Sequence, residues 1–266
     1  MTKSIVILSG AGISQESGLG TFRDRGGIWE EFDYKELATP EGYAQDPKRV
    51  LDFYNMRRSN LLSAEPNLAH EALARLEREY HSRVTIITQN IDDLHERAGS
   101  RSVIHIHGEL LRAFCAACGH RWDAPEVMNV EDTCPACGQA KARPDVVWFG
   151  EPPYHMEQIR DLLNSANLFV AIGTSGQVFP AANFVEDAAN AGAKTLELNL
   201  EPSGTTSAFD EVIIGPATAV VPKWVERILA NDFSGNDPHA PPPPMDIYIG
   251  KEGQVSGPYY RDEVQK

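Results

Sequence analysis

The sequence of 266 residues is short of positive charge. It carries 24 lysine and arginine residues against 38 aspartate and glutamate residues, which gives a formal net charge of −14. Because nucleic-acid backbones attract surfaces rich in lysine and arginine, this balance argues against a nucleic-acid partner. An acidic surface is compatible with lysine-rich protein substrates, although it is also typical of an ordinary soluble protein.

The chain also lacks a hydrophobic run long enough to span a membrane. Its N-terminus leads directly into the apolar run at 5–8, which is too short for the hydrophobic region of a signal peptide. The four cysteines all fall in two close pairs. Such cysteine usage fits a reducing compartment, and we therefore expect a cytoplasmic protein that does not bind membranes.

The two cysteine pairs predict a zinc ribbon. Each pair has the form C-x-x-C, and fifteen residues separate Cys115 and Cys118 from Cys134 and Cys137. This spacing falls within the zinc-ribbon pattern. Four thiolates saturate a tetrahedral zinc ion and leave no position for water, so the metal is expected to be structural. The alternative is two disulfides, which the missing secretion signal and the glycine after each pair disfavour.

Apolar runs typical of buried strands alternate along the chain with helical patterns. This alternation predicts an α/β fold with a parallel, doubly wound sheet, whose ligands bind at the carboxyl ends of the strands. The strands are expected at 5–8, 83–88, 103–106, 168–172, 195–198 and 212–214. The helices are expected at 47–62, 66–80, 93–97, 155–166, 184–191 and 220–229.

A glycine-rich turn at 9–14 follows the first strand. A strand, a glycine-rich turn and the start of a helix form a cradle for phosphate, since glycines let the backbone approach and the helix N-terminus offers free N–H groups. The spacing is not G-x-G-x-x-G, because Gln15 stands three residues after Gly12. The segment is therefore either a nucleotide site or only a turn. The loop at 21–29 either closes over a ligand or is solvated.

Composition changes at the C-terminal end. Residues 232–244 include four consecutive prolines and predict a semi-rigid linker. The tail at 245–266 resembles the opening hairpin of a GYF-like adaptor module and is too short for a core of its own. We treat it as a partial module and a candidate to bind a protein partner.

Several short motifs resemble the sirtuin family of NAD-dependent protein-lysine deacylases. Each is modest alone, but their ordered set is highly specific and covers about residues 1–230. Within the family the likeness is to compact bacterial members that remove acidic acyl groups. The matching blocks are Gly10-Ala11-Gly12-Ile13-Ser14 with Phe22-Arg23, Gln89-Asn90-Ile91-Asp92, His107-Gly108, the four cysteines, Val146-Val147-Trp148-Phe149-Gly150-Glu151, Gly173-Thr174-Ser175 and Asn199.

The resemblance implies a Rossmann-like large domain and a small domain made of a helical insertion and the zinc ribbon. The catalytic domain would span residues 1–231. Its small domain would come from about 30–80 and 110–145, with the zinc module at 115–137. NAD and the acylated lysine would meet in the cleft between the two domains.

The resemblance also implies the chemistry. The acyl oxygen attacks C1′ of the nicotinamide ribose, nicotinamide leaves, a base activates a ribose hydroxyl, and water completes release of lysine and O-acyl-ADP-ribose. Histidine titrates near neutrality and suits the role of the base. His107 occupies the position of this base in the family, whereas His105 is expected to face the other way.

Residue roles follow from the same resemblance. Asn90 would order the ribose and a water, Asp92 would bind the nicotinamide carboxamide, and Arg23 would order the diphosphate. The implied catalytic residues are His107, Asn90 and Asp92. The implied cofactor-binding residues are Gly10, Ala11, Gly12, Ile13, Phe22, Arg23, Gln89, Asn90, Ile91, Asp92, Gly173, Thr174, Ser175, Asn199, Leu200, Glu201 and Ala217. Val147, Phe149, Gly150 and Glu151 would pair with the substrate backbone as an added strand.

Tyr54 and Arg57 indicate the acyl group. They lie three residues apart on a predicted helix and so share a face. An arginine fork binds a carboxylate in a bidentate manner and a tyrosine hydroxyl adds a hydrogen bond, as a succinyl or malonyl group requires. Ala38 matches the small residue that widens the pocket in this subgroup. The alternative is that Arg57 is an ordinary surface arginine beside Arg58.

Other functions stay open at this point. A mono-ADP-ribosyltransferase would use the same NAD site, and a non-catalytic module would bind NAD or ADP-ribose without turnover. The acyl-lysine channel residues disfavour the first, and the set of His107, Asn90 and Asp92 disfavours the second. A hydride-transfer dehydrogenase is weakest, because no acid/base pair accompanies a G-x-G-x-x-G motif here.

Overall fold

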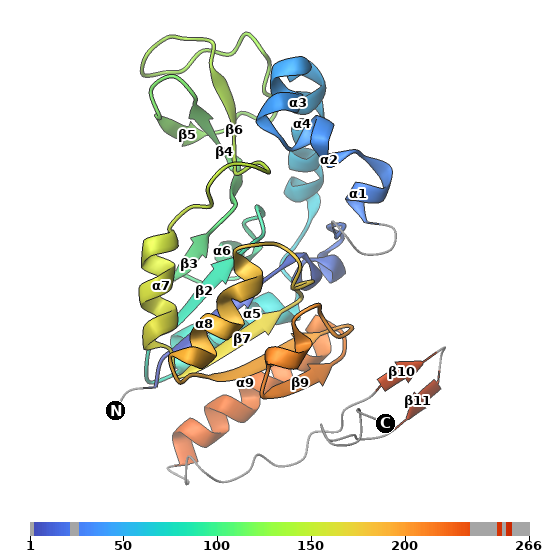
Figure 1. The fold of residues 1–266 in the computed structure, drawn as a ribbon, viewed down its shortest axis with the longest axis vertical. Coiled ribbons are helices and arrows are strands. Elements are labelled where there is room, and N and C mark those ends of the chain that lie inside the picture. Colours follow the sequence, from blue (N-terminus) through green and yellow to red (C-terminus); the bar gives the residue numbers. More distant parts are fainter. Residues whose placement is uncertain (1–2, 22–26, 235–248, 252–253, 257–266) are drawn as a thin grey trace.

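The large domain is built on one fully parallel sheet. The structure is a computed structural model that describes residues 3–21, 27–234, 249–251 and 254–256. Six strands lie in the order β3-β2-β1-β7-β8-β9 (Figure 1). This is the strand order of a Rossmann sheet, whose ligand crevice opens between the first and fourth strands. The strands are β1 (Ile5–Ser9), β2 (Val84–Thr88), β3 (Val103–His105), β7 (Leu168–Ile172), β8 (Lys194–Asn199) and β9 (Glu211–Ile214).

Helices cover both faces of this sheet, as the alternating pattern predicted. Successive residues of a strand point to opposite faces, so Ile5 and Ile7 join one apolar core while Val6 and Leu8 join the other. The first core contains residues of α5 (Leu68–Glu79) and α9 (Ala217–Ser234). The second contains residues of α7 (Met156–Ser165) and α8 (Phe184–Asn190). The doubly wound fold is confirmed.

A smaller domain combines short helices with an antiparallel sheet. Its helices are α1 (Ile28–Glu31), α2 (Tyr34–Leu37), α3 (Pro40–Gln45) and α4 (Pro47–Ser63). Its sheet has the order β5-β4-β6, with β4 (Gly108–Cys115), β5 (Arg121–Asp123) and β6 (Ala142–Val146). Arg58 of α4 ties the two parts together, since its guanidinium donates to the carbonyls of Leu110 and Glu126. Its side chain is buried in this contact.

The helical insertion ends earlier than expected. Residues of α5 pack against the parallel sheet, in the same core as Ile5 and Val84. The boundary near residue 80 is therefore too late, and the insertion ends with α4 at Ser63. Pro66 does not lie in the first turn of α5. Asn67 caps the helix, accepting a hydrogen bond from the N–H of Ala69, and Pro66 precedes this cap.

The glycine-rich turn is not followed by an α-helix. Two short 3-10 turns, η1 (Ala11–Ile13) and η2 (Gln15–Ser17), take its place. The N–H of Gly12 donates to the carbonyl of Gly173 at 2.8 Å, so this segment bonds to the loop after β7. A helix N-terminus directly after β1 is therefore the wrong description of the cradle.

The remaining elements are short. They are α6 (Leu94–Arg97), η3 (Ala181–Asn183), η4 (Thr206–Ala208), and the strands β10 (Ile249–Lys251) and β11 (Gln254–Ser256). In the tail, β10 and β11 pair in antiparallel fashion. Helix α9 reaches Ser234, so the linker begins later than residue 232, and residues 235–248 lie outside the described part. Among the described helices, none combines the length and hydrophobicity that a membrane crossing requires.

Candidate active site

The carboxyl ends of four parallel strands meet at one cavity. The loops after β1, β2, β7 and β8 line a space of about 580 Å³ together with α4 and the segment after β6. The large and small domains therefore both contribute to its walls. The predicted residues that line it are Gly10, Ala11, Gly12, Ala38, Tyr54, Arg57, Gln89, Asn90, Ile91, His107, Val147, Phe149, Gly150, Glu151, Gly173, Thr174, Ser175, Asn199, Leu200 and Glu201.

The other predicted residues have different places. Asp92 lines a neighbouring space of about 20 Å³ that Arg57 and Asn90 share. Ala217 lines a third space, of about 270 Å³, beside Asn199 and Leu200. Ile13 is fully buried. Phe22 and Arg23 lie outside the described residues.

Glycine allows the loops after β1 and β7 to touch. Gly173 has a φ of +60°, and a Cβ atom there would lie 2.5 Å from the backbone nitrogen of Ile13. The next residue, Thr174, anchors two more strand ends. Its hydroxyl accepts from Gln89 at 2.9 Å, and its carbonyl accepts from Asn199 at 2.8 Å. The backbone is thereby arranged for close approach of a dinucleotide at the crevice.

The turn after β2 holds two polar side chains in a buried network. The amide of Asn90 donates to the carbonyl of Gly10 at 3.2 Å and to the hydroxyl of Ser14 at 3.1 Å. Ser14 donates in turn to Asp92 at 3.0 Å. Burial raises the pKa of Asp92, while the bonds from the Leu94 N–H and from Ser14 counteract that rise. Asn90 and Asp92 are therefore positioned as one unit.

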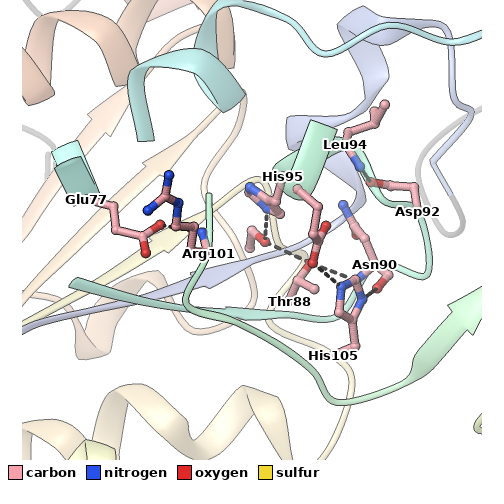
Figure 2. A network of polar contacts seen from close by, with 10 residues as sticks. Glu77, Thr88, Asn90, Asp92, Leu94, His95, Arg101 and His105 are labelled. Carbon is pink, nitrogen blue, oxygen red and sulfur yellow. Dashed lines mark hydrogen bonds and ion pairs between the residues drawn. The ribbon is translucent and has the colours of Figure 1, made fainter. Parts of the chain in front are cut away.

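A second chain of hydrogen bonds, which includes Thr88 and His95, supports the backbone of Asn90 (Figure 2). The N–H of Asn90 donates to the hydroxyl of Thr88 at 3.1 Å, and Ser9 donates to the same hydroxyl at 2.9 Å. His95 lies 2.8 Å from Ser9 through Nε2. Because the one proton of Ser9 goes to Thr88, His95 donates from Nε2. Burial holds the pKa of His95 well below its usual value, so its imidazole is neutral.

His107 is arranged as a neutral base at the cavity. Its Nδ1 lies 3.0 Å from the carbonyl oxygen of Gln89, which can only accept, so Nδ1 carries the proton. Nε2 is left with its lone pair. Burial lowers the pKa of His107, although the bond to Gln89 opposes this effect. The ring is therefore unprotonated at neutral pH and able to take a proton.

His105 does not face the other way, as the sequence interpretation held. Its Nδ1 lies 3.1 Å from the carbonyl oxygen of Asn90, next to the carbonyl that His107 contacts. β3 ends at His105 and residues 106 and 107 form a turn, which brings both rings to the carbonyls of the turn after β2. That expectation was wrong, and His105 belongs to the support of this turn.

The end of the cavity beside α4 is formed mainly by aromatic residues. Trp148 donates from Nε1 to the hydroxyl oxygen of Tyr54 at 3.0 Å. Burial raises the pKa of Tyr54 to about 12, so the phenol keeps its proton. Arg57, one turn along α4, has its Cζ 5.9 Å from the centre of the Phe53 ring. Burial lowers the pKa of Arg57, and Tyr54 and Asp92 partly restore it.

The segment after β6 is fixed by internal bonds. The N–H of Val147 donates to the carbonyl of His107, and the N–H of Phe149 donates to the carbonyl of Ala38, each at 2.9 Å. The carboxylate of Glu151 accepts two bonds of 2.7 Å from Arg143. Arg143 also lies over the Trp148 ring, with Cζ 3.5 Å from its centre.

The four cysteines lie together as metal ligands would. The Sγ atoms of Cys115 and Cys137, and those of Cys118 and Cys134, are 3.7 Å apart, and all four lie within 4.8 Å of one another. Zinc–sulfur bonds of about 2.3 Å place tetrahedral sulfurs about 3.8 Å apart. All four thiols are free, so the disulfide alternative is wrong. The donor set fits one structural zinc ion.

Known proteins match this chain over the same elements. A model of the Sir2 family matches residues 10–180. The chain is 54% identical over 230 residues to an NAD-dependent protein deacylase of Caulobacter vibrioides, covering 85% of this chain and 97% of that protein. An NAD-dependent protein deacylase of Vibrio cholerae is 52% identical over 231 residues, covering 86% and 94%. The chain belongs to the Sir2 family.

Solved structures of Sir2 proteins share its fold. A mutant Sir2 homologue in complex with ADP-ribose has a TM-score of 0.82 and 36% identity, covering 88% of this chain and 95% of that one. A Sir2 protein bound to a myristoylated histone peptide has a TM-score of 0.68 and 32% identity, covering 88% and 94%. The resemblance and the fold class predicted from the sequence are confirmed.

Several site residues of this Sir2 protein escaped the sequence interpretation. Phe53 and Trp148 line the cavity, and both could have been found, because Phe53 lies one turn from Arg57 and Trp148 lies inside a matched motif. His70 and His95 could not. They lie on different helices, and the centres of their rings are 5.0 Å apart. Burial lowers the pKa of His70 to about 4.

Proposed function

We propose that this protein removes acyl groups from lysine side chains of proteins in an NAD-dependent reaction. The observation that carries the proposal is the neutral His107 at a cavity where the loops of a Rossmann sheet meet a small domain, in a chain of the Sir2 family. Relatives with 54% and 52% identity are named NAD-dependent protein deacylases. Neither of the alternatives, an ADP-ribosyltransferase or a non-catalytic NAD-binding module, has an observation in its favour.

The residues of the site have separate roles in the proposed reaction. The loops with Gly12, Gly173 and Asn199 would hold NAD along the crevice. NAD, when bound, supplies the ribose carbon that accepts the acyl oxygen and the hydroxyl that is later activated. Nε2 of His107 takes a proton at that step, because its lone pair is free and its ring is neutral. Asn90 and Asp92 would orient the nicotinamide end through their shared network.

Zinc would support the small domain and take no part in the chemistry. Cys115, Cys118, Cys134 and Cys137 would occupy all four tetrahedral positions, which leaves none for water or substrate. Free thiols of this kind persist in a reducing compartment, and this supports action in the cytoplasm.

We further propose that the acyl pocket accepts succinyl and malonyl groups as well as acetyl. Since the Tyr54 oxygen accepts a bond from Trp148, its own proton is available to donate into the pocket. Arg57 lines the same cavity, and its planar fork suits a carboxylate. A terminal carboxylate would therefore meet one charged and one neutral donor. An acetyl group would leave both donors to water.

A paired assay tests both proposals. Peptides with acetyl-lysine and succinyl-lysine are incubated with NAD, and nicotinamide and O-acyl-ADP-ribose are followed by mass spectrometry. We expect turnover of both peptides. Turnover of the acetyl peptide alone would keep the deacylase and remove the carboxylate clamp. ADP-ribose on protein without O-acyl-ADP-ribose would favour transferase activity, and NAD binding without nicotinamide release would favour a binding module.

The Arg57→Met variant examines the clamp directly. It removes the charge and keeps most of the side-chain length, so kcat/KM for the succinyl peptide should fall by at least about tenfold, as expected for a lost charged hydrogen bond. Turnover of the acetyl peptide should be largely retained. Arg57→Lys is the matched control, because it keeps the charge and loses the fork. An equal loss for both peptides in Arg57→Met would contradict the clamp.

The C-terminal residues are proposed to form a separate part of the molecule. The predicted proline-rich linker at 232–244, whose first residues belong to α9, would carry a GYF-like segment at 245–266 that binds a protein partner, which the composition and the paired strands β10 and β11 support. Deletion of residues 235–266 should leave kcat for a peptide substrate unchanged. A lower kcat would instead make the tail a part of the catalytic domain.

A further inference from the structure

The backbone of the turn after β2 is bonded on both sides. The N–H of Gln89 donates to the carbonyl oxygen of Ser9, and the N–H of Asn90 donates to the hydroxyl of Thr88. Two successive carbonyls, of Gln89 and Asn90, each meet the Nδ1 atom of a histidine. One is His107, the base of the proposed reaction. The other is His105, for which the reaction has no role.

His105 lies between two groups that can only accept a proton. Its Nδ1 is 3.1 Å from the Asn90 carbonyl oxygen, and its Nε2 is 2.8 Å from a carboxylate oxygen of Glu96. A neutral imidazole carries one N–H and can satisfy one of them. Only the imidazolium donates to both. Figure 2 shows the ring of His105 pointing toward Asn90 beneath the network of Thr88 and His95.

We propose that His105 is a positioning residue that, as an imidazolium bound to Glu96, holds the Asn90 carbonyl and thereby orients Asn90 and Asp92 toward NAD. The proposal rests on the proposed role of this turn in binding NAD. His105 touches neither substrate nor cofactor in this scheme. It acts through the peptide that joins Asn90 to Ile91, whose rotation would move Asn90 directly and Asp92 through the Ser14 hydroxyl that both contact.

The charges around His105 favour the protonated ring. Burial by itself lowers its pKa, but the bond and charge of Glu96, the charge of Glu109 and the Asn90 carbonyl together raise it above the usual value. Two further carboxylates act on it, Asp92 and Asp93. A protonated His95 would repel the His105 cation, but the ring of His95 is neutral.

This arrangement is expected to weaken NAD binding at alkaline pH. The raised pKa means that the contribution of His105 is fully present below the ordinary histidine pKa of about 6.5 and is lost as pH rises through the raised value. When the proton leaves, the charged Glu96 retains the one remaining N–H, since bonds to ionised acceptors are stronger. The Asn90 carbonyl then faces a lone pair. His107 has the opposite shift, so the two histidines would set the two limbs of the pH profile.

Two substitutions separate this proposal from a merely structural role. His105→Gln cannot donate to both acceptors, so KM for NAD should rise about tenfold, as for a lost bond to a charged group. Glu96→Gln should act differently. Its amide donates to Nε2, which keeps the proton on Nδ1 for Asn90 at every pH, so the alkaline rise in KM for NAD should vanish.

The experiment measures KM for NAD and kcat with an acetyl-lysine peptide from acid to alkaline pH. His81→Gln, which changes an exposed histidine away from the turn, is the control and should keep the profile of the unmodified protein. Imidazole ¹⁵N signals of the unmodified protein should show both nitrogens of His105 protonated at neutral pH. Because the ¹⁵N measurement uses the unmodified protein, it tests the proposal even where a variant folds poorly.

Three outcomes would overturn the proposal. The first is a neutral His105 at pH 7, and the second is a KM for NAD that His105→Gln leaves unchanged. The third is an alkaline rise in KM for NAD that persists in Glu96→Gln. Asn90→Ala tells these apart from a failure of the proposed function. If Asn90→Ala raises KM for NAD and His105→Gln does not, the turn binds NAD and His105 has no part in it. If neither does, the turn itself is not the NAD site.

Discussion

His107 combines a protonated Nδ1 with a half-buried ring, and this makes it a base over a wide pH range. Burial lowers its pKa, so activity should stay constant from neutral pH down to below about 6.5 and fall only at lower pH. The sign follows from the mechanism, since a protonated ring cannot take a proton. The measurement is the pH dependence of kcat for the acetyl peptide.

His107→Ala should lose that turnover by at least about a hundredfold, the contribution typical of a general base. NAD should still bind, which is measured by calorimetry. Retained turnover in this variant would assign the base to another residue. His120, an exposed histidine of the zinc module, offers a control substitution that should leave the rate unchanged.

At the scale of elements, the segment after β6 connects the proposed acyl pocket to an ion pair. Glu151 binds Arg143, Arg143 lies over Trp148, and Trp148 bonds to Tyr54 on α4. The pocket donor is therefore oriented by a residue on another element. Trp148 has its backbone in the matched motif, but its side-chain role depends on α4 packing beside that segment.

Trp148→Phe should lower kcat/KM for the succinyl peptide by about fivefold, since one neutral hydrogen bond contributes about 1 kcal/mol. The Tyr54 hydroxyl would then turn its proton elsewhere or bind water. The acetyl peptide, which does not use that hydroxyl, should show a smaller change. Both peptides are measured in parallel, and a loss of kcat/KM confined to the acetyl peptide would contradict this prediction.

At the scale of the whole molecule, the zinc ribbon and the helical insertion form one support for the cleft. The buried Arg58 donates to the carbonyl of Leu110, on the strand that leads into the zinc ribbon, and to that of Glu126, between its two cysteine pairs. Loss of the metal would therefore disturb α4, which carries Tyr54 and Arg57. The parallel sheet has its own two cores, and neither contains a cysteine.

Chelation should consequently unfold the small domain and leave the sheet folded. We expect a chelator to abolish peptide turnover and to reduce far-ultraviolet circular dichroism only in part, with one zinc released per chain. Restored activity on adding zinc completes the measurement. A single cooperative loss of all structure would show instead that the two domains fold as one unit.

The sequence alone determined the parallel sheet, the zinc ligands and most of the residues at the cavity. These depend on local patterns, because buried strands are continuous apolar runs and metal ligands keep a short spacing. Strand ends deliver the residues that follow them to one edge of the sheet, so the strand pattern is enough to bring Asn90, His107 and Thr174 together.

Only the tertiary structure decided the rest. In the structure α5 packs in the large domain and not in the insertion, because the hydrophobic pattern of an amphipathic helix does not specify which element the helix packs against. The tertiary structure also buried Arg58 and turned His105 toward Asn90. Those placements depend on which carbonyls and carboxylates of distant segments come within hydrogen-bonding distance, and packing of the whole chain sets that proximity.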